Sequence, residues 1–177
     1  MDNNVLLWIK SVLETTPARW INLSQTLPAE LLKRSPAPRE WSALECLQHL
    51  VDTERHVFPV RVKYLLAGQD FPAFDPDGQG TVLEEGKSAG DLAEEFANMR
   101  RGSLELLEQL NSNDLEKRAR HQELGVVTLS ELLHEWAGHD LMHTVQAERA
   151  LMQPFIAACG PWQRYFADHA IDPILDS

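Results

Sequence analysis

The sequence predicts an all-α fold, a four-helix bundle with a short C-terminal extension. Apolar residues recur at intervals of three and four positions along four long stretches, which is the period of an amphipathic helix. No stretch shows the alternation of polar and apolar residues that is typical of strands. Four long amphipathic helices are expected to bury their apolar stripes against one another, and 177 residues suffice for one sizeable core. We therefore expect residues 1–177 to form one domain.

The first helix is predicted from residue 2 to about residue 27. Its apolar period begins at Val5 and continues through Trp20 to Leu27. Pro17 lies inside this period, and it predicts a kink or a restart because proline lacks the backbone N–H. The stretch 28–40 contains three prolines, each of which disfavours helical backbone in its predecessor, so it is expected to be a connection.

The second helix is predicted to begin after Ser42 and to end at Gly68. Ser42 and Glu45 have the spacing of a capping box, in which two side chains satisfy backbone N–H groups at the helix start. Pro59 predicts a bend in this helix. Residues 70–86 follow without either period, and a loop of this length in a compact domain is often functional. We expect it to cover or line a site.

The third and fourth helices are predicted to start after Ser88 and Thr128. Asp91 and Glu131 follow these two residues at the spacing of a cap, and the third helix is expected to reach Leu110. Residues 111–127 are read as a polar connection. The helical pattern breaks beyond residue 153, which leaves a short aromatic segment, 161–166, that is expected to pack across the bundle or onto a partner subunit.

Composition excludes several classes of function. The formal net charge is −11, from 27 acidic and 16 basic residues, and a partner made of nucleic acid or an anionic membrane would require concentrated Lys and Arg. No apolar run approaches the roughly 18 residues that span a bilayer. Two cysteines form no disulfide framework and no leader opens the sequence, which predicts a cytoplasmic protein with no nucleic-acid and no membrane partner.

His139 and His143 are the first candidates for a functional site. They lie four positions apart in the fourth predicted helix, so both imidazoles project from one face about one turn apart and can reach one cation. Both fall on the apolar stripe, and ligands of helical bundles project inward in this way. His134 is nine positions from His143, roughly half a revolution around the helix, and is expected to face away.

A third ligand must come from another helix, and the second helix offers two histidines. His49 and His56 share roughly one face, but they are separated by about 10 Å along the helix, too far for both to reach one ion. The direction of the second helix relative to the fourth cannot be read from periodicity. Spacing alone therefore leaves both candidates open, with a small advantage for His49.

Several segments of the chain resemble the DinB-like superfamily of damage-inducible and YfiT-like metalloenzymes. They are WSALECLQHLVDTE, the long acidic loop, GVVTLSELLHEWAGHD and HDLMHTVQ, which occur in the order of that family and cover most of the chain. The resemblance implies a four-helix bundle that binds a divalent metal ion through one histidine of the second helix and two of the last long helix. Transferred to this sequence, the ligands are His49, His139 and His143.

The resemblance also implies a range of activities and partners. Some relatives are thiol-dependent S-transferases or isomerases that use bacillithiol, mycothiol or glutathione. A small-molecule substrate, such as a low-molecular-weight thiol, and a homodimer are therefore expected. The metal is zinc, nickel or iron, because imidazole suits all of these ions and affinity order does not select among them.

Three imidazoles leave at least one position on a zinc-like ion for water, substrate or a thiol, as in catalytic centres. Such an ion lowers the pKa of bound water or of a thiol, which favours a hydrolase or an S-transferase. Asp52, three residues after His49, is a candidate to orient an imidazole or to act as a general base. Asp140 and Gln146 are expected to support the ligands or cap the helix. The alternative is a bundle that binds a metal or small ligand without catalysis.

Overall fold

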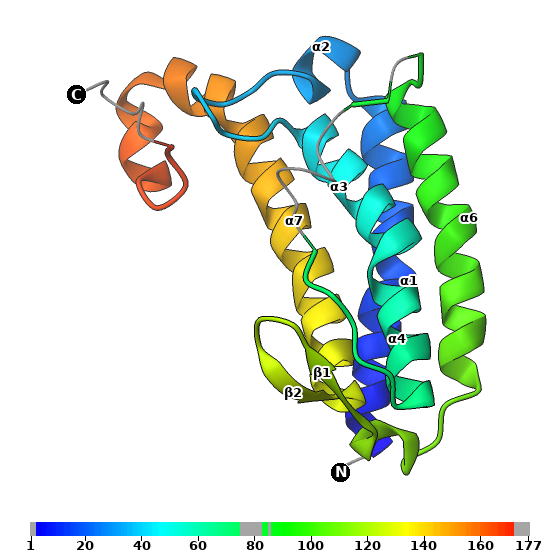
Figure 1. The fold of residues 1–177 in the computed structure, drawn as a ribbon. Coiled ribbons are helices and arrows are strands. Elements are labelled where there is room, and N and C mark those ends of the chain that lie inside the picture. Colours follow the sequence, from blue (N-terminus) through cyan, green and yellow to red (C-terminus); the bar gives the residue numbers. More distant parts are fainter. Residues whose placement is uncertain (1–2, 75–82, 85, 172–177) are drawn as a thin grey trace.

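Four long helices form the body of the molecule in a computed structural model that describes residues 3–74, 83–84 and 86–171. They are α1 (Asn3–Thr26), α3 (Ala43–His56) continued by α4 (Phe58–Ala67), α6 (Ala89–Glu108) and α7 (Leu129–Ala158). Figure 1 shows them lying lengthwise beside one another, with the C-terminal segment standing away from the bundle. The predicted all-α bundle is confirmed.

Each of α1 and α3 packs against both α6 and α7, so α1 and α3 occupy opposite corners of the bundle. The helices α3 and α7 are antiparallel. Trp41, just before α3, stacks on His143, whereas Phe58, at the start of α4, stacks on Trp136. Increasing residue numbers on one helix thus meet decreasing numbers on the other, which resolves the direction that periodicity left open.

The predicted starts of the second, third and fourth helices are confirmed, whereas the restart at Pro17 and the helix end at residue 153 do not occur. Ser42, Ser88 and Thr128 each form a capping box with the residue three positions later. However, α1 runs without interruption past Pro17, and α7 continues through Pro154 to Ala158 instead of ending at residue 153. Buried Leu151 and Ile156 flank Pro154, and their packing stabilises this last part of the helix.

The bend predicted at Pro59 occurs two residues earlier, at Val57. This residue has φ −115° and ψ −77°, and it separates α3 from α4. Pro59 lies in the first turn of α4, where its missing N–H costs no intrahelical hydrogen bond. Gly68 ends α4 with φ 64°, a left-handed conformation that favours glycine, as the sequence predicted.

The connection predicted over residues 111–127 contains a β-hairpin, which the sequence did not predict. A short 3₁₀ helix, η1 (Asp114–Glu116), precedes β1 (Arg118–His121) and β2 (Gly125–Thr128). The strands are antiparallel, with Arg118 opposite Thr128, and Phe71 pairs with His121 beside them. Strands of four residues are too short to establish an alternating pattern in the sequence.

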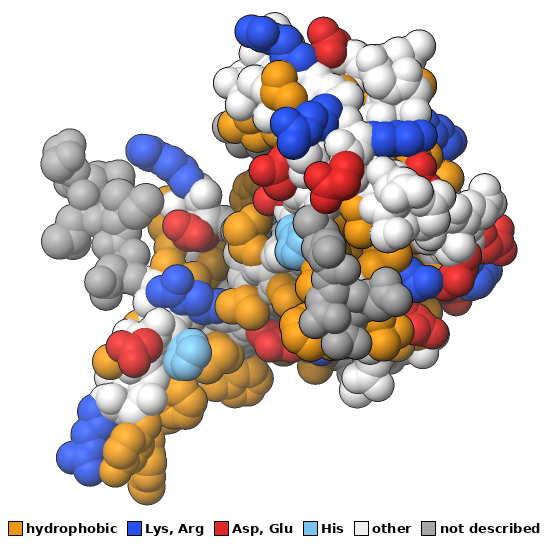
Figure 2. All heavy atoms as spheres, turned by 90° about the horizontal axis from the view of Figure 1, so that it is seen from below, with side chains coloured by type: hydrophobic (Ala, Val, Ile, Leu, Met, Phe, Trp, Pro, Cys, Tyr) orange, Lys and Arg blue, Asp and Glu red, His pale blue; other side chains and the backbone are white. Residues whose placement is uncertain are grey.

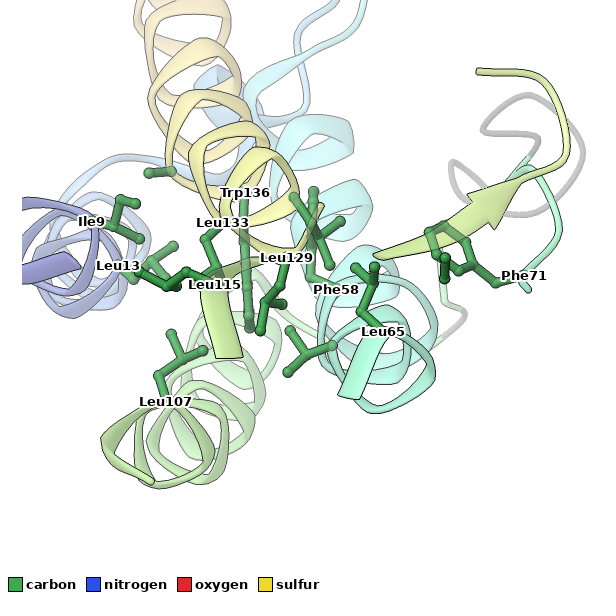
Figure 3. Packing of buried hydrophobic residues seen from close by; sticks show 14 residues of the cluster. Ile9, Leu13, Phe58, Leu65, Phe71, Leu107, Leu115, Leu129, Leu133 and Trp136 are labelled. Atoms are coloured by element: carbon green, nitrogen blue, oxygen red, sulfur yellow. The ribbon is translucent and has the colours of Figure 1, made fainter. Parts of the chain in front are cut away.

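Buried apolar side chains form two clusters along the bundle. Figure 3 shows the first, in which Leu13 of α1, Leu107 of α6 and Trp136 of α7 converge with side chains from α4. The second contains Trp20 and Phe96 together with residues of α3 and α7. On α7 the first cluster ends at Ala137 and the second begins at Ala147, so His139 and His143 lie between them.

The remaining described elements are short. They are α2 (Ala29–Leu32), within the predicted connection, and η2 (Gly160–Phe166), which packs on α7. Much of the loop predicted over residues 70–86 to cover a site, namely 75–82 and 85, lies outside the described residues. No helix among the described residues has the length and apolar character needed to cross a bilayer.

Candidate metal centre

Three histidines from two helices meet in the middle of the bundle. His49 of α3 and His139 and His143 of α7 each offer a ring nitrogen, and these nitrogens all lie within 4.8 Å of one another. The Nε2 atoms of His49 and His139 are 3.0 Å apart, although 90 positions separate the two residues in the chain. Within the described part of the chain, no further His, Cys, Asp or Glu joins this group.

Aromatic rings surround the three imidazoles. Trp41 stacks on His143 with 5.6 Å between the ring centroids, and it also lies 5.0 Å from the ring of His49. Phe58 meets His139 edge to face at 5.0 Å. His49 and His143 are only 4 % and 5 % exposed. Trp41, just before α3, therefore forms one wall of the histidine cluster.

The surroundings keep two of the imidazoles neutral. Burial, together with the other two histidines and Arg100, lowers the pKa of His139 to about 2. Burial and His49 lower the pKa of His143 to about 4, although its hydrogen bond to Gln146 acts in the opposite direction. Neutral imidazole is the form that binds a metal ion, so both rings carry an available lone pair at neutral pH.

Gln146 fixes the orientation of one ring. Nδ1 of His143 donates a hydrogen bond to Oε1 of Gln146 at 2.9 Å, which leaves Nε2 as the lone-pair nitrogen. Histidines that bind metals usually donate their second ring nitrogen to such an acceptor. By contrast, Nδ1 of His139 is buried and finds no hydrogen-bond partner among the described residues. These features fit a divalent ion bound by three nitrogens.

The other histidines considered in the sequence analysis lie outside the cluster of three. His56, the alternative third ligand, is exposed at the end of α3, and His134 is exposed with its Nδ1 hydrogen-bonded to the carbonyl of Ser130. The outward direction predicted for His134 is confirmed. The structure thus brings together the set His49, His139 and His143 that the resemblance implied.

Asp52, the candidate general base, is buried one turn from His49. Its carboxylate accepts hydrogen bonds from Nε2 of Gln48 and Nη1 of Arg55, both at 3.1 Å. Burial raises the pKa of Asp52 against the opposing effects of Gln48 and Arg55. The predicted roles, orienting an imidazole or acting as a base, remain predictions.

A buried ionic cluster beside the histidines was not predicted. Arg100 of α6 binds Asp140 through Nη1 at 2.6 Å and Glu54 through Nη2 at 2.8 Å, and all three side chains are 1 % exposed. Arg100 also donates to the carbonyl of Leu13 at 2.9 Å. Asp140 thus binds Arg100, and its predicted role in supporting the ligands or capping the helix remains a prediction. The available signal in the sequence was the position of Arg100 four residues after Phe96, on the apolar side of the predicted third helix.

The ends of the loop that the sequence predicted to be functional do approach the site. Phe74 lies 6.5 Å from His49 between ring centroids. Glu84 accepts hydrogen bonds from Arg55 at 3.1 Å, and its backbone N–H donates to Gln48. Both described ends of the loop therefore meet α3 close to His49 and Asp52.

Comparisons with known proteins identify a family and agree with the fold. The model of the DinB superfamily matches residues 12–147 of the chain. A solved structure, that of YfiT from Bacillus subtilis, superposes with a TM-score of 0.75 at 17 % identity, over 88 % of this chain and 90 % of that chain. YfiT is described as a probable metal-dependent hydrolase with an unusual four-helix bundle topology. No curated protein matches the chain.

Proposed function

Because this chain belongs to the DinB superfamily, we propose that His49, His139 and His143 bind one divalent metal ion and that the centre is catalytic. The reaction is hydrolysis or transfer of a thiol to a small-molecule substrate. The ion is zinc, nickel or iron, all of which accept imidazole ligands.

One observation carries this proposal, namely that ring nitrogens of His49, His139 and His143 all lie within 4.8 Å of one another. Structural zinc sites usually have four protein ligands, whereas catalytic sites have three and keep one position for water or substrate. The described residues supply three and no fourth. A description of YfiT as a probable metal-dependent hydrolase supports the hydrolytic reading, and the chemistry of a thiolate nucleophile supports transfer.

A divalent ion at this centre would supply Lewis acidity, lowering the pKa of water or of a thiol that occupies the open position. The protein would contribute a fixed and partly dry environment. Gln146 holds the ring of His143, while Trp41 and Phe58 limit the access of water to the imidazoles. Asp52 is a buried carboxyl with a raised pKa, and it is our candidate for holding a proton during the reaction.

Turnover tests the proposal directly. Protein purified without a histidine tag is loaded in turn with zinc, nickel and iron(II). It is then assayed for hydrolysis of esters and amides and for transfer of glutathione, bacillithiol or mycothiol to electrophiles. We expect turnover that chelation removes and metal restores. His139→Ala should abolish it, and His134→Ala, on the same helix but outside the cluster, should not.

The alternative function, metal binding without catalysis, predicts a different result. The protein would then hold its full complement of metal, and His139→Ala would lose it, but none of these substrates would be turned over. A protein of either kind still requires the same three ligands, so metal content alone does not separate the two functions.

We also propose that the protein is a homodimer. Exposed apolar side chains support this, because α7 presents Leu141, Met142 and Val145 to solvent and the C-terminal segment presents Trp162 and Tyr165. Hydrophobic side chains gather on the projecting C-terminal segment in Figure 2. Large exposed apolar patches are typical of interfaces. Light scattering should give twice the chain mass of 20.1 kDa, and a mass of one chain would refute the dimer.

A further inference from the structure

A cavity of about 580 Å³ lies between α4 and the segment that follows it. After α4 the chain turns back toward the middle of the bundle (Figure 1), and residues 71–74 form the second wall. The volume is within the range of pockets that bind small organic molecules, roughly 300–1,000 Å³. The described residues that line it include His56, Val57, Arg61, Tyr64, Phe71 and Phe74.

The cavity adjoins the histidine cluster. Phe74 lies in its wall and has its ring centroid 6.5 Å from that of His49. Val57, also in the wall, precedes Phe58, whose ring meets His139. The three histidines are not among the described lining residues, so Phe74 and the neighbouring pair Val57 and Phe58 are what connect the cavity to the proposed metal centre.

The charges that line the cavity are unlike those of the protein as a whole. The chain has a net charge of −11, yet the described lining residues include no carboxylate. Arg61 is the charged side chain among them, and the others are the imidazole of His56 and apolar or aromatic groups, including Tyr64. A basic group within an apolar cavity is suited to an organic anion.

Arg61 has unused hydrogen-bonding capacity. Its Nη2 donates one long hydrogen bond, 3.4 Å, to the carbonyl of Pro72, and its guanidinium lies 5.4 Å from the ring centroid of Phe71. It forms no ion pair with any described residue, and burial lowers its pKa. Glu123 and Glu135 influence it from a distance, and Glu135 lines a separate hollow on the other side of Arg61 and Phe71. Within the described part of the chain, four of its five N–H donors therefore have no acceptor.

We propose that this cavity binds the substrate through a carboxylate group held by Arg61, with an aromatic or aliphatic body against Tyr64, Phe71 and Phe74. The inference rests on the proposed function, because it names the class of substrate that the metal centre would act on. Arginine suits this role, since its planar guanidinium can bind a carboxylate through two parallel hydrogen bonds.

Benzoate and benzamide are suitable probes because they share a shape and differ in charge. Each is titrated into metal-free and zinc-loaded protein, and binding is measured by calorimetry or ligand-observed NMR. We expect the wild type to bind benzoate more tightly than benzamide in both forms. Arg61→Gln should weaken benzoate about tenfold or more and leave benzamide unchanged, because a charged hydrogen bond is lost.

Lys63→Gln is the matched control. Lys63 is exposed on the same helix and lines a different hollow, so this variant removes the same charge without touching the cavity. It should bind benzoate as the wild type does, and Arg61→Lys, which keeps the charge, should bind more tightly than Arg61→Gln. Metal content should be unchanged in all three variants.

Three results would overturn the inference. The first is equal binding of the two probes by the wild type. The second is that Arg61→Gln binds benzoate as tightly as Lys63→Gln does. The third is binding of benzoate only when zinc is present, which would place its carboxylate on the metal. Because the metal-free protein is measured as well, failure of the metal centre would not itself abolish the predicted preference for benzoate.

Discussion

Arg100 on α6 and Asp140 on α7 form a buried ion pair in which Nη1 lies 2.6 Å from Oδ2 and Nη2 lies 3.1 Å from Oδ1. Glu54 of α3 and the carbonyl of Leu13 in α1 also bind this guanidinium. One arginine thus connects all four corners of the bundle. Asp140 follows His139 directly, and Glu54 lies on the same helix as His49, so the cluster fixes both helices that carry the proposed ligands.

Replacing Arg100 with methionine should strongly destabilise the protein. The change leaves Glu54 and Asp140 buried without their cation, and breaking a buried ion pair in this way costs about 3–5 kcal/mol. Urea denaturation measures the free energy of unfolding. Arg101→Met, at the exposed neighbouring position, should change it by less than about 0.5 kcal/mol. Equal effects of the two variants would contradict the role assigned to Arg100.

Gln146→Leu should weaken metal binding without unfolding the helix. The variant removes the acceptor for Nδ1 of His143, and loss of such a partner typically costs about 10–100-fold in metal affinity. Competition with a chromophoric chelator gives the dissociation constant. Glu148→Leu, at an exposed position on the same helix, should leave affinity unchanged. Identical constants for Gln146→Leu and the wild type would show that this hydrogen bond does not support the ligand.

The metal-free protein should lose stability as the pH falls below about 6.5. The pKa values of His139 and His143 are lowered from 6.5 to about 2 and about 4 in the folded state. Between pH 6.5 and 4 the unfolded chain therefore binds more protons at these residues than the folded protein does. The free energy of unfolding should fall by about 1.4 kcal/mol per pH unit for each histidine.

The variant with both His139→Gln and His143→Gln isolates this contribution. It lacks both imidazoles but keeps the carboxylates that also titrate in acid. Because the imidazoles no longer contribute, its free energy of unfolding should depend less steeply on pH between 6.5 and 4. Thermal or urea unfolding at several pH values gives the two slopes. If the slopes of the variant and the wild type coincide, the two imidazoles are not buried as neutral bases.

The sequence was sufficient for the helices because the apolar period and the capping boxes are local signals. Ser42, Ser88 and Thr128 begin helices as predicted. Proline was a weaker guide, since packing on both sides of Pro154 keeps α7 continuous. The β-hairpin was missed because its strands have four residues each and are stabilised by pairing with each other and with Phe71.

For the candidate site, the spacing of His139 and His143 placed two imidazoles on one inward face. It did not choose between His49 and His56, because that choice depends on the direction of α3 relative to α7. The resemblance to a family supplied His49. The ionic cluster of Arg100 was missed because its two carboxylate partners lie 46 and 40 positions away along the chain. The residues near Arg100 in the sequence do not indicate which carboxylates it binds.

Metal content tests the central claim most directly. Tag-free protein is loaded with zinc, freed of excess ion, and measured by elemental analysis beside His49→Ala, His139→Ala and His143→Ala, with His56→Ala and His134→Ala as controls. We predict one ion per chain in the wild type and in both controls, and less than one in each of the first three variants. A wild type without bound metal, or His139→Ala with as much metal as His134→Ala, would contradict the three-histidine centre.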